Sequence, residues 1–132
     1  MTVRRVLVTG SRDWPDPNVV WTALDSELFR GTLTTTDTLV VVHGACPTGA
    51  DLEADRWVKA RSAEIRTADI RVKRYPADWR RLRRAAGPVR NAEMVAAGAD
   101  QCLAFIYRRS QGATGCAELA EKAGIRTLRW TR

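Results

Sequence analysis

The sequence predicts a single α/β domain over residues 1–132, with a mostly parallel sheet of about five strands and helices on both faces. Short apolar runs rich in β-branched residues recur along the chain, stretches of helical periodicity separate them, and glycine-rich segments follow several of the runs. Strands that alternate with helices form parallel sheets, because each right-handed crossover returns the chain to the same sheet.

The first half of the chain is expected to hold two strand–helix units. Val6–Thr9 and Leu39–Val42 are short apolar runs, each followed closely by glycine, which is typical of buried strands. Apolar residues recur at helical spacing from Asn18 to Phe29. A second helix is expected to begin at Thr48 or Gly49, with Thr48 as its N-cap.

The second half continues the alternation. Ile70–Tyr75 predicts a third strand, and Pro88–Ala97 predicts a helix with proline near its start. Cys102–Ile106 predicts a fourth strand, and apolar residues from Cys116 to Ala123 line a final helix. Thr127–Trp130 is expected to be the last strand.

Composition narrows the class of protein. With 132 residues, 45% hydrophobic and 28% charged, the chain fits one ordinary globular domain rather than a disordered or fibrous chain. No apolar run is long enough to span a bilayer and no signal-peptide pattern is present, so we expect a cytoplasmic protein without membrane contact. The three widely spaced cysteines predict neither a disulfide framework nor a metal site, and we expect no cofactor.

The positive charge is concentrated in one segment. Between positions 71 and 90 the only acid is Asp78, and the excess of basic residues equals the net charge of the whole chain, +7. The basic residues there are Arg71, Lys73, Arg74, Arg80, Arg81, Arg83, Arg84 and Arg90. Such a segment suits an anionic partner, including weak and non-specific binding of nucleic acid, although a solvated helix face would also explain it.

Candidate ligand-binding residues follow the first two strands, where open parallel sheets bind ligands. Gly10, Ser11, Arg12, Asp13 and Trp14 combine a close-approach glycine, a hydroxyl and a guanidinium suited to phosphate. A tight turn with a surface arginine would give the same pattern.

The segment after the second strand offers a helix start suited to an anion. Gly44, Thr48 and Gly49 lie there, and free amide groups at such a start bind phosphate. A capped loop in which Asp51 complements the helix dipole is the alternative.

Two further segments complete the expected site. Arg90 and Asn91 lie near the start of the helix expected at Pro88–Ala97, before the fourth strand. An arginine at that position opposes the helix dipole and is therefore better explained by a ligand. Ser110, Gly112 and Thr114 belong to a small-residue segment after the fourth strand, which we expect to be a loop that closes over a ribose or phosphate.

The ordered set of motifs resembles one family. Val-Thr-Gly-Ser-Arg-Asp-Trp at 8–14, His-Gly-Ala-Cys-Pro-Thr-Gly-Ala-Asp at 43–51, Pro-Ala-Asp-Trp at 76–79 and Ala-Gly-Pro-Val-Arg-Asn-Ala-Glu-Met at 86–94 are similar to the YspA-type, cpYpsA-related branch of the SLOG superfamily. The resemblance implies a Rossmann-like fold and a nucleotide-related ligand. That superfamily also includes the LOG phosphoribohydrolases, the DNA-processing protein DprA and nucleotide sensors.

These observations favour a protein that binds a nucleotide or nucleotide-derived ligand through phosphate-binding loops. One alternative is an N-glycosidic hydrolase acting on nucleoside monophosphates, with Asp51 and Glu93 as candidate acid or base. The LOG glutamate motif is broken here, so Glu118 is not assigned that role. The other alternative is a nucleic-acid-binding module that uses residues 71–90. The oligomeric state is left open, with a homodimer as one option.

Overall fold

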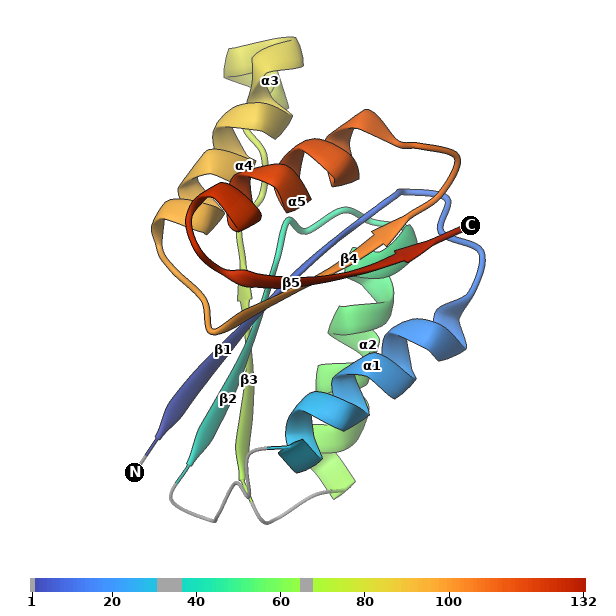
Figure 1. Ribbon diagram of the computed structural model, residues 1–132, viewed down its shortest axis with the longest axis vertical. Helices are drawn as coiled ribbons and strands as arrows, with labels where there is room; N and C mark the ends of the chain where they lie inside the picture. Colours follow the sequence, from blue (N-terminus) through green and yellow to red (C-terminus); the bar gives the residue numbers. More distant parts are fainter. Residues whose placement is uncertain (1, 31–36, 65–67) are drawn as a thin grey trace.

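A computed structural model describes residues 2–30, 37–64 and 68–132 of the chain. Its centre is a five-stranded, entirely parallel sheet in the order β3-β2-β1-β4-β5 (Figure 1). The strands are β1 (Val3–Gly10), β2 (Thr38–His43), β3 (Asp69–Arg74), β4 (Gln101–Ile106) and β5 (Arg126–Thr131). All five carboxyl ends therefore meet at one edge of the sheet.

Helices cover both faces of the sheet. Helices α1 (Pro17–Arg30) and α2 (Gly49–Glu64) pack on one face, where Val6 and Val8 of β1 enter their apolar core. Helices α4 (Ala86–Ala96) and α5 (Gln111–Lys122) pack on the other, around Leu7 and Cys102. The short helix α3 (Trp79–Leu82) and the 3-10 turn η1 (Arg83–Ala85) project beyond the carboxyl edge, as Figure 1 shows at the top.

The predicted α/β architecture is confirmed, together with its mostly parallel sheet and its helices on both faces. Each of the five predicted strands is present, and α1, α2 and α4 coincide with the predicted helices to within a few residues. None of the helices in the described part of the chain has the length and apolarity needed to cross a membrane.

One local prediction was wrong. The segment from Ser110 to Gly115 was expected to be a loop, but α5 already begins at Gln111, with Ser110 as its N-cap residue. Gly112 and Gly115 have open space around them and so serve neither a bend nor a close contact. The apolar face formed by Ala113, Cys116 and Ala117 on the sheet outweighs the low helix propensity of the two glycines.

Two glycines let the β1–α1 turn approach the start of α2. A Cβ atom on Gly10 would lie 2.4 Å from the Cβ of Ala50. A Cβ on Gly49 would lie 2.2 Å from the carbonyl oxygen of Ser11, and Gly49 has a φ of +71° that L side chains rarely adopt. Only glycine fits at both positions without movement of the backbone.

We therefore expect Gly49→Ala to destabilise the fold. Left-handed strain and a backbone clash together should cost on the order of 2–5 kcal/mol of unfolding free energy. Chemical denaturation of parent and variant measures this. Gly115→Ala is the matched control, because its Cβ meets open space inside a helix and should leave stability unchanged or raise it. Equal stability of Gly49→Ala and parent would contradict the interlocked turn.

Candidate functional site

A cleft of about 1300 Å³ opens at the carboxyl edge of the sheet. Its floor is the end of β1 with the segment after β2, and its walls are formed by the segment after β3 with α4 and by the first turns of α5. The strand order reverses between β1 and β4, since the chain leaves β1 toward β2 and returns on the other side. Open α/β sheets bind ligands at this switch point.

Asp51 is the buried carboxyl of the cleft. Its side chain is 5% exposed, and Oδ2 accepts a hydrogen bond from the Cys46 amide at 3.2 Å. Oδ1 is buried, and among the described residues no donor has hydrogen-bond geometry to it. Burial raises the pKa of Asp51, while His43, the Cys46 amide, Arg90 and the Gly44 amide lower that pKa less strongly. An unsatisfied buried oxygen costs roughly 1–3 kcal/mol, so a ligand that donates a hydrogen bond to it would gain that interaction.

The segment that carries Asp51 is fixed by His43. The Nδ1 atom of this buried side chain accepts a hydrogen bond from the Ala45 amide at 3.0 Å, and Nε2 contacts Asp55 Oδ1 at 2.8 Å. A hydrogen bond from Arg74 lowers the pKa of Asp55, which keeps this acceptor ionised. Ala45 is held at a φ of 59°, an uncommon conformation for a residue with a side chain.

Arg90 ties three elements together. Its Nη1 donates to the carbonyl of Gly44 after β2 and, at 3.4 Å, to the carbonyl of Tyr75 after β3. Its Nε donates to Asn91 Oδ1 at 2.7 Å. The guanidinium thus has a structural function at the cleft wall, and this accounts for an arginine near the start of α4 without a ligand.

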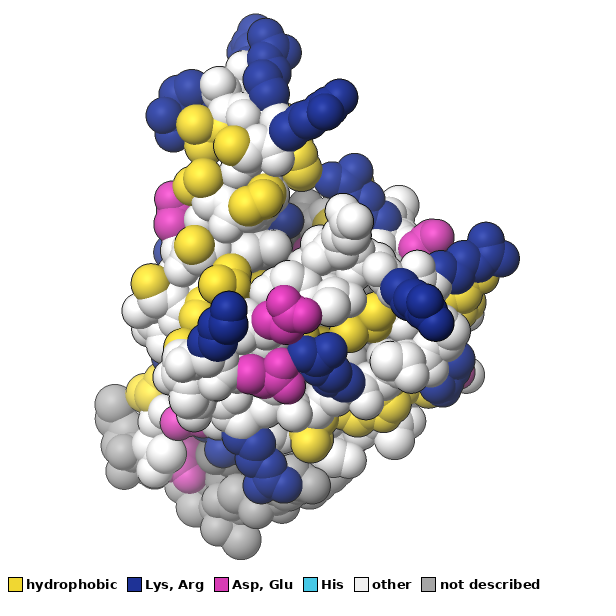
Figure 2. All heavy atoms as spheres, turned by 45° about the horizontal axis from the view of Figure 1, so that its top comes forward, with side chains coloured by type: hydrophobic (Ala, Val, Ile, Leu, Met, Phe, Trp, Pro, Cys, Tyr) yellow, Lys and Arg dark blue, Asp and Glu magenta, His cyan; other side chains and the backbone are white. Residues whose placement is uncertain are grey.

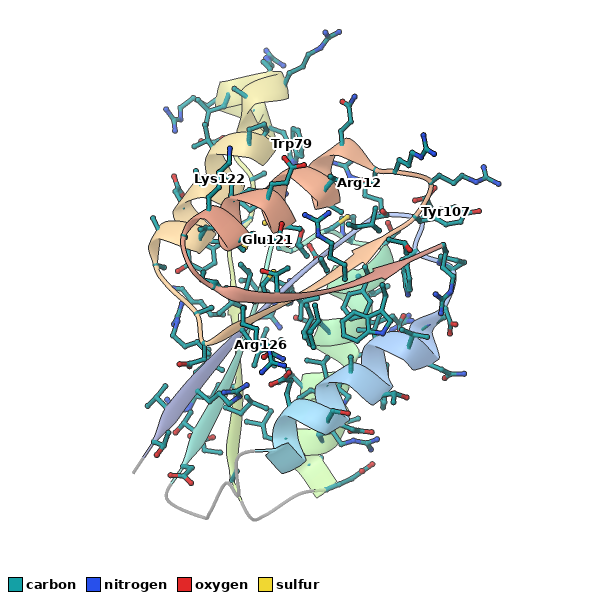
Figure 3. The ribbon with its side chains drawn as sticks, in the orientation of Figure 1. Arg12, Trp79, Tyr107, Glu121, Lys122 and Arg126 are labelled. Carbon is teal, nitrogen blue, oxygen red and sulfur yellow. The ribbon has the colours of Figure 1, made fainter. Side chains whose placement is uncertain are left out.

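Arg12 and Trp79 form the outer part of the cleft. The Arg12 guanidinium carbon lies 5.1 Å from the centroid of the Trp79 ring, within the range of a cation–π contact (Figure 3). Both side chains line the cleft, and Trp79 is 46% exposed. An exposed indole beside a guanidinium can accept a stacked base next to a bound phosphate.

The start of α5 contributes backbone amides to the cleft. The first intrahelical bond runs from the Thr114 amide to the Ser110 carbonyl, so the amides of residues 111–113 have no acceptor within the helix. Ser110, Gly112 and Ala113 line the cleft. Backbone amides and the helix dipole together favour a phosphate at such a position.

The structure brings most of the predicted ligand-binding residues together. Those that line the cleft are Gly10, Arg12, Asp13, Gly44, Asp51, Arg90, Asn91, Ser110 and Gly112. Thr48, Gly49 and Thr114 do not line it. Gly49 packs instead against the backbone of Ser11 and Arg12, which covers the start of α2.

Three other predicted residues are engaged elsewhere. The Ser11 hydroxyl accepts a hydrogen bond from the Tyr107 amide at 2.8 Å, which joins the β1 and β4 loops. Trp14 is buried, contacts Phe105 edge-to-face at 5.5 Å and donates its indole hydrogen to Asp16. Glu93 lies exposed on α4 and does not line the cleft, so its carboxylate is not beside Asp51.

Sequence reasoning had not assigned Trp79, Gln111 or Met94 to the site, although all three line the cleft. Trp79 had a signal, because it is an aromatic residue beside the basic segment. Met94 had none, since an apolar residue at helical spacing looks like core.

Burial raises the pKa of the Cys102 thiol to about 12, so this thiol is not a nucleophile at neutral pH. Among the described residues, no cluster of three or more His, Cys, Asp or Glu side chains could hold a metal ion.

Comparison with known proteins identifies the family of the chain. The profile of the YspA, cpYpsA-related SLOG family matches residues 4–82, more than half of the chain. The chain belongs to this SLOG family. It is also 47% identical over 123 residues to the Gene 61 protein of Mycobacterium phage D29, with 93% of each chain covered. No solved structure matches the chain significantly.

The buried carboxyl of this SLOG protein should make its stability depend on pH. Because the folded-state pKa of Asp51 is raised above its ordinary value of 3.8, ionisation of the buried carboxyl costs no stability below that value, and the cost grows as pH rises through the folded-state pKa. Asp51→Asn keeps an acceptor for Cys46 and removes the charge. We expect the variant to melt above the parent at pH 8, with a difference that shrinks as pH falls toward 4. A difference independent of pH would show that Asp51 is not the titrating group.

Proposed function

We propose that the cleft binds a nucleotide or nucleotide-derived ligand. The observation that carries the proposal is Asp51 Oδ1, a buried acceptor to which no described residue donates a hydrogen bond, in a cleft at the switch point. Ribose hydroxyls and base amino groups are the hydrogen-bond donors that a nucleotide offers. Membership of a SLOG family supports a nucleotide-related ligand.

The surrounding groups match the other parts of such a ligand. A phosphate fits the amide groups at the start of α5, with the Arg12 guanidinium as a second contact. The base fits against the exposed face of Trp79. The cleft volume of about 1300 Å³ exceeds the roughly 300–1,000 Å³ usual for small-molecule sites, which leaves room for a nucleotide with more than one phosphate.

Thermal shift with nucleotides and their parent nucleosides tests the proposal. Ligands that bind only the folded state raise the melting temperature with concentration, and we expect nucleotides to do so much more than nucleosides. Equal shifts for the two series would mean that phosphate does not contribute. No shift with any nucleotide would contradict the proposed function.

Arg12→Gln tests where the phosphate lies. Loss of a hydrogen bond to a charged group should remove roughly 1.5–3 kcal/mol of binding free energy, measured by isothermal titration calorimetry. Arg90→Ala is less informative, because Arg90 also holds the backbone of Gly44 and Tyr75. The matched control is Arg56→Gln, an exposed arginine on α2 outside the cleft, which should bind as the parent does.

A second candidate function is hydrolysis of the N-glycosidic bond. The raised pKa of Asp51 favours this function, because a general acid must hold its proton until the reaction. Against it stands the position of Glu93, the other carboxylate considered for catalysis, which lies outside the cleft. We expect no release of free base when nucleoside monophosphates are incubated with the protein and separated by chromatography. Base release that Asp51→Asn abolishes, with nucleotide binding retained, would make the protein a hydrolase.

A further inference from the structure

The basic segment 71–90 is divided by the fold into groups with different surroundings. Arg71 pairs with Asp69, and Arg74 pairs with Asp55 at 2.8 Å. Arg90 turns inward to backbone carbonyls at the cleft wall. These side chains already have partners within the protein, so they do not form one continuous surface with the rest of the segment.

The remaining arginines gather on the projecting end of the molecule. Arg80 and Arg81 lie on α3, and Arg83 and Arg84 lie on η1, all with exposed side chains. Figure 2 shows dark blue side chains clustered at this end, with no magenta among them in that view. We call these four arginines the crest.

The crest has little internal charge compensation. Asp78 pairs with Arg81 at 2.9 Å and also accepts a hydrogen bond from the Arg81 amide. Within the described residues, Arg80, Arg83 and Arg84 form no ion pair with an acidic side chain. Four like charges within five consecutive residues repel one another and are best offset by a polyanion.

The fold also holds the crest rigidly beside an exposed aromatic ring. Arg83 has a φ of 54°, which turns the chain sharply between α3 and η1. Trp79 is the first residue of α3. Its ring atom Cη2 would lie 3.4 Å from a Cβ placed on Gly87, so the indole packs against the start of α4. Arg12 contacts the ring, yet 46% of the residue remains exposed.

We propose that the crest binds single-stranded nucleic acid. Arg80, Arg83 and Arg84 contact successive phosphates, and an unpaired base stacks on the exposed part of Trp79. This combination of cationic groups with an aromatic platform is how proteins hold single strands without sequence preference. A duplex keeps its bases stacked on each other and can use the arginines but not the indole. The crest arginines lie outside the lining of the cleft, whereas Trp79 also lines it, so a base stacked in the cleft and a base of the strand would use the same ring.

Fluorescence anisotropy with a labelled 20-nucleotide single strand, over a range of salt concentrations, tests the proposal. The crest variant carries Arg80→Gln, Arg83→Gln and Arg84→Gln. The control variant carries Lys59→Gln, Lys122→Gln and Arg126→Gln, which remove the same amount of charge. The three side chains are exposed and lie on α2, α5 and β5. Figure 3 places Arg126 away from α3.

The parent should bind the strand at low salt, and the slope of log K against log salt should fall by about 2 in the crest variant, since each phosphate contact on a single strand contributes about 0.7. The control variant should keep most of the parental slope and affinity. Trp79→Leu should weaken single-strand binding at least about fivefold and leave duplex binding unchanged.

Three results would overturn the proposal. The first is no binding of the single strand at about 50 mM salt, where non-specific binding is strong. The second is an equal loss in the crest and control variants, which would make the effect one of net charge. The third is equal binding of duplex, or of poly-glutamate, which would assign the crest to another polyanion. Melting curves confirm that each variant is folded, and nucleotide binding in the cleft should be unchanged by the crest substitutions.

Discussion

The close approach of the β1–α1 turn to the first turn of α2 is the constraint on which the cleft depends. Gly10 lies against Ala50, and Gly49 lies against the backbone of Ser11 and Arg12. With any larger residue at these positions the two segments would separate. The contact directs the chain after Gly10 outward, so that Arg12 reaches the cleft rim while Ser11 turns to β4 and binds the Tyr107 amide. The same contact places the backbone of Ser11 and Arg12 against Gly49 at the start of α2, whereas Ser110, Gly112 and Ala113 at the start of α5 line the cleft.

Some arginines of the chain stabilise the fold, and others are exposed to solvent or to a ligand. Arg90 has carbonyl acceptors after two strands, so its charge is used to set the spacing of the cleft wall. Arg12 is exposed and contacts only an indole ring among the interactions of its guanidinium in the described structure, so it remains open to an anion. Asp51 lies in the same cleft, and its buried Oδ1 has no hydrogen-bond donor among the described residues.

The architecture could be predicted from the sequence because strand and helix periods are local properties. Buried parallel strands such as β4 are continuous apolar runs, and the glycine-bearing segments follow them. Three-dimensional contacts decided the rest. Gly49 packs against the backbone of Ser11 and Arg12, and Trp14 packs edge-to-face on Phe105, and neither contact is visible in the sequence. Residues 111–115 looked like a loop, because glycine content is visible in the sequence and packing against the sheet is not.

The central claim is that Asp51 Oδ1 receives a hydrogen bond from a nucleotide in the cleft. A crystal structure with the nucleotide that most raises the melting temperature tests it most directly. The account predicts a ribose hydroxyl or base amino group within hydrogen-bond distance of Oδ1, with a phosphate at the amides of residues 111–113. A nucleotide bound outside the cleft, or bound within it while Oδ1 stays without a donor, would contradict the account.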